Sequence, residues 1–416
     1  MSPKFPIGVA TTYNPGTKAF PSMRFNALLL FLLAIAASAF SADTPPGTTA
    51  ADDIDPATGL SRSSVVRPLM GAPAAPEARP AAAPSAPSLP LGRPHIALIL
   101  PTASQSLGRL AETVRLGFAA AAEAAGRETY PVIATAIDNE QAALVTSCAT
   151  AQSAGAILIV GGMTRDGAAL LAQSGCARVP ILALNEPPSG TEIPANVFTV
   201  SLSLEQEARQ AALLAVAEGR HTAVVIHSPS PLSRRVQEAF EREWTRAAGE
   251  IRGRLMFSGS PEDAPIVRDR LAGVNADMVF LALDPPEARA VRPYISGMLP
   301  VYATSMSINP RAEAIVNVDL QGVRYVEMPW FVQPDHPAVM VYPVPKGAGS
   351  SDQERLYALG IDAFRLSLLM LRPEPPRGPL DGVTGRIVLG AGNGFIRTLT
   401  PAEVDNGRVV AIKGAQ

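Results

Sequence analysis

The chain has 416 residues, more than one ordinary domain at about 150 residues per domain. A hydrophobic fraction of 47% and a charged fraction of 17% exclude a chain that is disordered throughout. The 35 Lys and Arg residues nearly balance the 37 Asp and Glu residues, so the net charge of -2 gives no global electrostatic basis for binding nucleic acid. Two cysteines exclude a disulfide-rich scaffold and a zinc site built from cysteines.

The first feature along the chain is an apolar run at residues 27–37. It is too short to span a membrane, because a helix needs about 20 residues to cross the hydrocarbon core. With the small-x-small motif at 37–39, it predicts a secretory signal peptide within residues 1–39 and export to the periplasm. Met23 is a candidate start. An uncleaved anchor helix is the alternative, and the only membrane association expected. No cysteine stands directly after the apolar run, so an outer-membrane lipoprotein is not predicted.

Residues 40–93 have a different composition. They contain ten prolines, many alanines and no aromatic residue after Phe40. Such a segment has too little apolar surface to build a core, so it is expected to be an extended, partly polyproline linker. A ligand for a proline-recognising domain is the alternative to a plain spacer.

From residue 94 onward the sequence alternates between strand and helix patterns. Residues 95–100 are almost continuously apolar, as is typical of a parallel strand covered on both faces. The other strands expected in the first set are 132–137, 156–160, 179–184 and 197–200, with helices at 107–125, 140–154 and 166–173. The second set has strands at 222–227, 254–258, 278–283 and 300–304, with helices at 204–217, 232–248, 263–272 and 286–295. This repetition predicts an α/β protein with two doubly wound parallel-sheet lobes.

The two lobes are expected to form one bilobed domain over residues 94–410. The predicted boundaries place lobe 1 at about 94–201 and 308–384, and lobe 2 at about 202–307 and 385–410. A helix at 353–371 and a hairpin of strands 385–389 and 394–399 complete the pattern. Three chain crossings between the lobes would account for such late elements.

Motifs for catalysis and for metal or cofactor binding are missing. The four histidines, His95, His221, His227 and His336, lack the spacing of metal ligands. The sequence has no Gly-x-Ser-x-Gly elbow, no Walker-type Gly-Lys-Ser/Thr, and no Ser-x-x-Lys followed by Lys-Thr-Gly. The glycine-rich residues 390–394 lie between two short strands, so a hairpin turn is favoured over a phosphate loop. We therefore expect a protein that is not an enzyme and has neither cofactor nor metal.

Candidate ligand-binding residues lie after the strands, because open α/β sheets bind ligands at the carboxyl ends of their strands. They are Thr102, Ser104, Gly162, Met163, Thr164 and Asn185 in the first lobe, and His227, Ser228 and Asp284 in the second. The backbone N–H groups around Gly162 and the Thr164 hydroxyl would suit a carboxylate. Simple helix caps at Thr164 or Asp166 and at Asp284, and a loop-fixing role for Asn185, are the alternatives.

Six segments, in order, resemble type I periplasmic binding proteins, and in particular the penicillin-binding protein activator family of LppC/LpoA-type lipoproteins. They are residues 96–121, 155–172, 179–185, 198–212, 359–370 and 382–400, so the resemblance covers roughly 94–410. It implies a bilobed periplasmic regulator whose partner is a peptidoglycan synthase of the penicillin-binding protein class. Described members also carry an N-terminal helical-repeat domain and a lipid anchor.

A solute-binding protein for amino acids or similar ligands, feeding an ABC transporter, is the alternative, because it has the same fold. The strand-end loops contain no aromatic residue and few charges, whereas solute clefts usually grip the ligand with such side chains. This observation favours the regulator. An enzyme acting on cell-wall peptides is a third class, without catalytic residues to support it.

Cys148 and Cys176 form a candidate disulfide. They are expected on or just after helices that are neighbours on one face of a doubly wound sheet. The periplasm is oxidising, which permits the bond. Two buried free thiols are the alternative.

Overall fold

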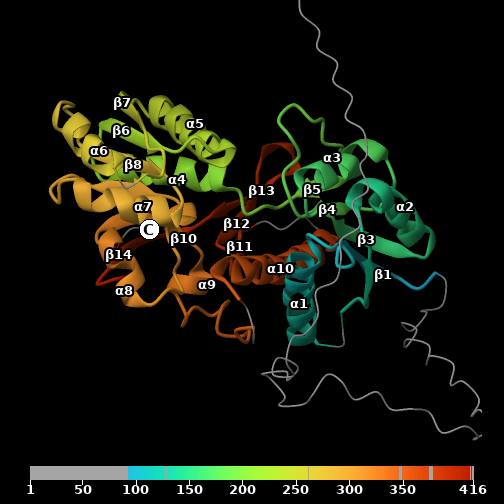
Figure 1. Cartoon of the computed structure of the whole chain (residues 1–416). Coiled ribbons are helices and arrows are strands. Elements are labelled where there is room, and N and C mark those ends of the chain that lie inside the picture. The colour runs from blue at the N-terminus through green and yellow to red at the C-terminus, as the bar shows by residue number, and fades with distance from the viewer. Residues whose placement is uncertain are drawn as a thin grey trace, which may run out of the picture. The chain divides into compact units, whose positions relative to one another are not determined.

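The computed structural model describes residues 92–126, 129–260, 262–345, 349–373, 378–412 and 414 (Figure 1). The signal peptide expected within 1–39 and residues 40–91 of the expected linker lie outside this part. Within the described ranges, no helix combines the length and the apolar character needed to cross a membrane.

The first lobe is a five-stranded parallel sheet with the order β2-β1-β3-β4-β5. Its strands are β1 (His95–Leu100), β2 (Val132–Ala136), β3 (Ala156–Gly161), β4 (Ile181–Ala183) and β5 (Val197–Thr199). All six residues of β1 are buried, as its apolar run predicts, because helices cover both faces. The covering helices are α1 (Gly108–Ala125) on one face, and α2 (Glu140–Ser153) and α3 (Arg165–Ser174) on the other.

The second lobe is a seven-stranded mixed sheet with the order β15-β14-β10-β9-β8-β6-β7. Five parallel strands are β6 (Thr222–His227), β7 (Glu250–Met256), β8 (Met278–Ala282), β9 (Val301–Ala303) and β10 (Val323–Glu327); β14 (Thr400–Asp405) and β15 (Arg408–Ala411) are antiparallel. Its main helices are α4 (Leu204–Ala217), α5 (Pro231–Arg246), α6 (Asp263–Ala272) and α7 (Pro285–Val291). The two doubly wound lobes confirm the predicted fold class.

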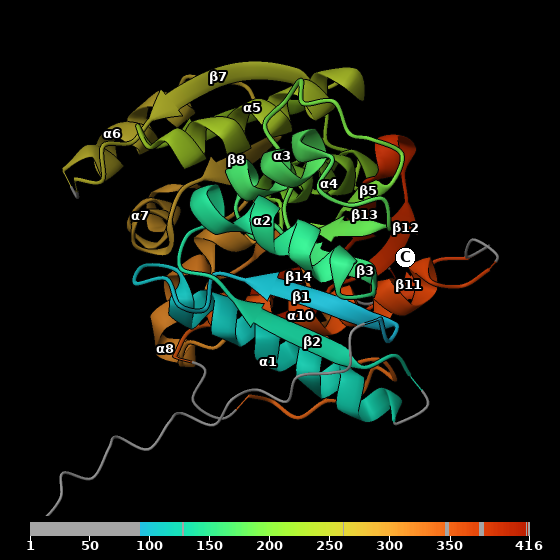
Figure 2. The same cartoon turned by 90° about the vertical axis from the view of Figure 1, so that its right-hand side faces the viewer.

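The late helix α10 (Ser351–Met370) returns to the first lobe and packs lengthwise on α1 (Figure 2). Two glycines allow the close approach. A Cβ on Gly117 would lie 1.9 Å from the Tyr357 carbonyl oxygen, and a Cβ on Gly360 would lie 2.1 Å from the Val114 carbonyl oxygen. Both neighbours are backbone atoms, which cannot move aside as the end of a side chain can. The missing side chains therefore set the distance between the two helices.

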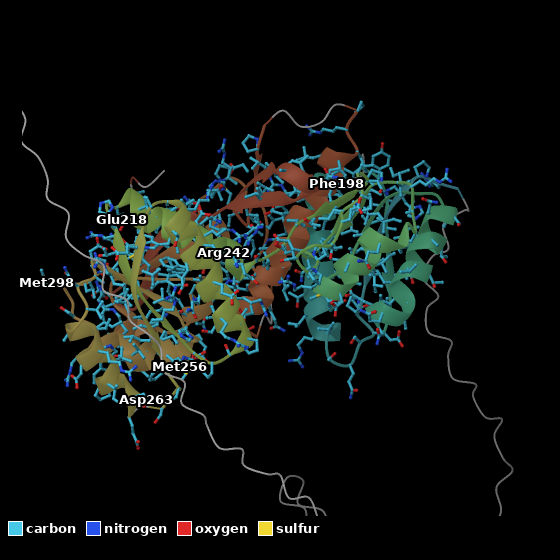
Figure 3. All side chains as sticks on the ribbon, turned by 90° about the horizontal axis from the view of Figure 1, so that it is seen from above. Phe198, Glu218, Arg242, Met256, Asp263 and Met298 are labelled. Carbon is cyan, nitrogen blue, oxygen red and sulfur yellow. A yellow bond between two sulfur atoms is a disulfide. The ribbon has the colours of Figure 1, made fainter. Side chains whose placement is uncertain are left out.

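The remaining elements correct the predicted lobe boundaries. β10 lies in the second sheet between β9 and β14, although residues 308–384 were assigned to lobe 1. The predicted hairpin is confirmed as β12 (Arg386–Leu389) and β13 (Phe395–Thr398), but it does not join the second sheet. It forms a separate antiparallel sheet with β11 (Leu380–Asp381) and approaches β5, which carries Phe198 (Figure 3). The rings of Phe198 and Phe395 stack with their centroids 6.1 Å apart.

Short helical segments connect the late strands of the second lobe. They are α8 (Ala314–Asn317) and α9 (Pro329–Val332), with 3-10 turns at Arg292–Tyr294, Ser305–Ser307 and Val318–Leu320. A further 3-10 turn, Ala391–Asn393, connects β12 and β13 of the third sheet. The segment between α9 and α10 leads the chain back to the first lobe.

Cys148 of α2 and Cys176, which follows α3, are joined by a disulfide with a Cα–Cα distance of 5.8 Å. The bond crosslinks two helices on the same face of the first sheet. It closes a loop of 28 residues.

We predict that replacing Gly360 by Ala destabilises the protein, because the new methyl group meets backbone atoms of α1. Overpacking of this kind typically costs about 1–3 kcal/mol, more than the gain of roughly 1 kcal/mol in helix propensity. Urea unfolding monitored by circular dichroism measures the change. Gly297→Ala is the matched control, since no atom lies within 4 Å of a Cβ built there. Equal unfolding free energies for the two variants would contradict the packing argument.

We predict that the denatured, unreduced protein contains no thiol that reacts with a labelling reagent, and that it exposes two after reduction. On the chain-entropy model, a loop of this length stabilises the fold by about 3.5 kcal/mol. The double variant Cys148→Ser, Cys176→Ser should therefore unfold at lower denaturant concentration than the oxidised wild type. Two reactive thiols before reduction would show that the bond does not form.

Candidate functional site

The loop after β3 holds a carboxylate that belongs to the chain itself. The backbone N–H of Met163 donates to Glu140 Oε1 at 2.7 Å, and the N–H of Thr164 donates to Glu140 Oε2 at 3.1 Å. The Thr164 hydroxyl also donates to Glu140 Oε2. These are the donors that the sequence suggested for a carboxylate ligand. Glu140, 5% exposed, fills the position instead.

Glu140 is held there by the first turn of α2. Asn139 caps this helix and accepts a hydrogen bond from the N–H of Gln141 at 2.8 Å. Gly167 of α3 makes room for the Glu140 carboxylate, because a Cβ at residue 167 would lie 2.2 Å from Glu140 Oε2. Thr164 is the N-cap of α3 and accepts from the Gly167 N–H at 2.9 Å. One carboxylate thus links the N-termini of two helices, where the helix dipoles favour negative charge.

The other first-lobe candidates have local roles. Asn185 fixes its loop, because its Nδ2 donates to the Met163 carbonyl at 2.9 Å and its Oδ1 accepts from the Glu186 N–H at 2.9 Å. Ser104 lines a small cavity of about 250 Å³ together with Glu140 and Thr164. Thr102 is not among the residues lining that cavity.

The second-lobe candidates have similar structural roles. The N–H of Ser228 donates to Ser233 Oγ at 2.9 Å. Asp284 forms a capping box with Glu287 at the start of α7. His227, Ser228 and Asp284 line neither the cavity beside Glu140 nor the one beside Asn185. The structure therefore does not bring the nine candidates together around one ligand position.

An ion triad, which the sequence did not suggest, bridges the lobes. Glu205, in the first turn of α4, lies 3.5 Å from Arg165 of α3 and 2.9 Å from Arg235 of α5. Burial alone would raise the pKa of Glu205, but hydrogen bonds from the backbone and from Arg235 outweigh it, so the pKa is lowered. The triad borders a cavity of about 230 Å³ that also contacts Met163 and Asn185.

A second ionic connection joins α10 to the second lobe. Arg355 Nη2 lies 2.6 Å from Glu327 Oε2 at the end of β10, and the two side chains are 8% and 0% exposed. Burial opposes the charge of Arg355, yet Glu327 and Glu207 raise its pKa. The preceding residue, Glu354, accepts hydrogen bonds from Arg311 and from the Trp330 indole N–H. α10 therefore has buried, charge-assisted contacts with the opposite lobe.

The closing segment of the domain is fixed by a buried carboxylate and a buried guanidinium. Asp362 of α10 accepts from the N–H of Thr384 at 2.8 Å and from its hydroxyl at 2.7 Å. Arg397 of β13 donates to the Ser201 carbonyl at 2.8 Å and to the Thr384 carbonyl at 3.0 Å. Burial raises the pKa of Asp362 and lowers that of Arg397. These bonds tie the third sheet to the start of the crossing into the second lobe.

In the described part of the chain, no group of three or more His, Cys, Asp or Glu side chains is arranged to hold a metal ion. The buried charged residues are instead engaged with one another or with backbone groups. The geometry of these groups supports binding and structural roles.

The curated relatives that match this chain are described as penicillin-binding protein activators. A penicillin-binding protein activator LpoA from Edwardsiella piscicida is 26% identical over 306 residues, which are 63% of this chain and 44% of the relative. The LpoA from Klebsiella pneumoniae is 25% identical over 329 residues, covering 68% of this chain and 46% of the relative. The chain thus spans about half the length of the curated relatives it matches.

Solved structures extend the comparison. The C-domain of LpoA (YraM) from Haemophilus influenzae, described as a regulator of PBP1A, is 25% identical with a TM-score of 0.64, covering 76% of this chain and 99% of that one. A structure from Chromobacterium violaceum, described as a "putative branched-chain amino acid ABC transporter", is 34% identical with a TM-score of 0.65, covering 75% of this chain and 100% of that one.

The sequence model of one family, "LppC putative lipoprotein", matches residues 91–262 and 267–407. These ranges include the first sheet, the second sheet except β15, the helix α10 and the third sheet. The protein described here belongs to the LppC family.

Proposed function

We propose that this protein is a non-enzymatic regulator in the periplasm that binds and activates a peptidoglycan synthase of the penicillin-binding protein class. Relatives named as penicillin-binding protein activators match most of the bilobed domain, and the Haemophilus influenzae C-domain is described as a regulator of PBP1A. The disulfide is consistent with an oxidising compartment.

The observation that favours a regulator over a solute-binding protein is the Glu140 carboxylate in the loop after β3. Three donors that would suit a solute carboxylate are already satisfied by this buried side chain. A solute would have to displace a carboxylate that is covalently part of the domain, and so present at high effective concentration. This supports a protein whose surface binds a partner over one that captures small carboxylates.

Amino-acid binding is the second candidate function. The 34% identity to the Chromobacterium violaceum structure favours it. A protein of this class would bind its solute between the lobes and deliver it to an ABC transporter. Because the fold is common to both functions, only binding experiments separate them.

The first experiment tests the partner and the solute in parallel. Immobilised protein is incubated with detergent-solubilised penicillin-binding proteins, and calorimetry is run against a panel of amino acids. We expect recovery of a synthase and no heat from the amino acids. Micromolar binding of a single amino acid without recovery of a synthase would overturn the regulator and establish the solute-binding alternative. Thr164→Ala removes a helix cap and one donor to the Glu140 carboxylate, so it should cost about 1–3 kcal/mol of stability and leave synthase recovery unchanged.

The second experiment tests whether Glu140 occupies a carboxylate site. Glu140→Ala leaves its donors unpaired, so we expect a loss of about 1–3 kcal/mol of stability. Added acetate should raise the melting temperature of this variant and leave that of the wild type unchanged, because acetate replaces the missing carboxylate. Glu238→Ala, at an exposed residue of α5, is the matched control. An equal effect of acetate on all three proteins would contradict a specific site.

A further inference from the structure

A further cavity of about 560 Å³ lies where the chain passes from the third sheet into the second sheet. It shares no lining residue with the cavities beside Glu140 and beside Asn185. Pro329, Leu399 and Pro401 give it an aliphatic surface. Its volume is within the range of about 300–1,000 Å³ that is typical of small-ligand sites.

Hydrogen bonds fix the segments that frame this cavity. The Thr400 hydroxyl donates to Gln333 Oε1 at 3.0 Å, which joins the start of β14 to the end of α9. The Trp330 N–H donates to the Val383 carbonyl at 3.1 Å, which joins α9 to the loop between β11 and β12. A ligand would therefore enter a preformed space, with little ordering of the protein to oppose binding.

Arg386 of β12 is the guanidinium in the cavity lining. Its side chain is exposed, and no acidic group of the described residues lies within ion-pair distance of it. The nearby Arg365, in contrast, is engaged by Asp362 at 3.1 Å and by the Asp381 carbonyl at 2.8 Å. An arginine without a partner presents the planar set of N–H donors that binds a carboxylate through two parallel hydrogen bonds.

Asp381 of β11 supplies an acceptor next to this donor. It is the cross-strand neighbour of Arg386, and such pairs have Cα atoms about 4.5–5.5 Å apart. Instead of pairing with Arg386, Asp381 Oδ1 lies 3.4 Å from His336 Nε2. The Nδ1 atom of His336 accepts from the Ala338 N–H at 3.2 Å, so a neutral ring carries its proton on Nε2, facing Asp381. The Asp381 side chain is 69% exposed, which leaves its carboxylate room to accept from a ligand as well.

We propose that this cavity binds the C-terminal end of a short peptide, with the terminal carboxylate on Arg386 and the last amide N–H on Asp381. These two groups are attached to the same Cα of a peptide, and they match two adjacent side chains of opposite character. The peptide's apolar side chains would lie against Pro329, Leu399 and Pro401. A plain anion would meet Asp381 without a donor, and a free amino acid would leave most of the aliphatic surface uncovered. The inference goes beyond the proposed regulator and does not depend on it.

The test is calorimetry of the purified protein with three probes: N-acetyl-leucyl-alanine, its C-terminal amide, and free leucine. We expect the acid to bind, and the amide and free leucine to bind at least tenfold more weakly. Arg386→Gln should weaken binding of the acid at least tenfold, to the level of the amide, because the bidentate charge-assisted contact is lost. Arg386 is exposed, so this variant should keep the melting temperature of the wild type.

Two further variants make the result specific. Arg408→Gln is the matched control, with the same change at an exposed strand residue outside the cavity lining, and it should keep the affinity for the acid. Thr398→Tyr, at the exposed cross-strand neighbour of Arg386, should block the cavity and weaken binding of the acid.

Four results would each overturn the proposal: no binding of the acid by the wild type, equal affinity for the acid and the amide, equal affinity for the acid and free leucine, or unchanged affinity in Arg386→Gln. Recovery of a synthase enters none of these measurements, so failure of the proposed regulator and failure of the peptide site are distinguishable.

Discussion

The docking of α10 is the interaction on which the rest of the structure depends. Gly117 and Gly360 bring its backbone against α1, so the helix completes one face of the first lobe. Its first turns also carry Glu354 and Arg355, which pair with Arg311 and Glu327 on the second-lobe side. A single helix therefore fixes both the packing of one lobe and its position against the other, and it does so from late in the sequence.

This arrangement has a consequence for the cleft between the lobes. One apolar cluster continues from the inner face of the first sheet through α1 and α10 to α4, α5 and the inner face of the second sheet. Hinge opening would separate the Glu205 triad and strain the Arg355–Glu327 pair. Breaking a buried pair leaves an uncompensated charge, so the contacts resist the motion by which solute-binding proteins admit ligands. Such a domain is suited to presenting a constant surface.

The sequence predicted the parallel strands well, because buried strands such as β1 and β8 are continuous apolar runs. It missed β10, whose Arg324 and Glu327 break the apolar pattern. In the fold these charges are compensated by Glu218 and Arg355, residues remote in the chain. Contacts between residues remote in the chain also limited what could be predicted of the site. The Thr164 cap followed from local spacing, whereas the Glu140 carboxylate reaches its loop only through the packing of α2 beside α3.

The relatives show why such details decide function in this fold. Two solved structures with nearly equal TM-scores carry different descriptions, one "a regulator of PBP1A" and the other a "putative branched-chain amino acid ABC transporter". Overall geometry does not distinguish them, so the distinction has to come from individual side chains. Here a carboxylate at the first residue of α2 accepts the hydrogen bonds of the loop after β3, and Gly167 provides the space for it. A change confined to the occupant of one loop could thus alter what the cleft binds while the sheets and helices around it stay the same.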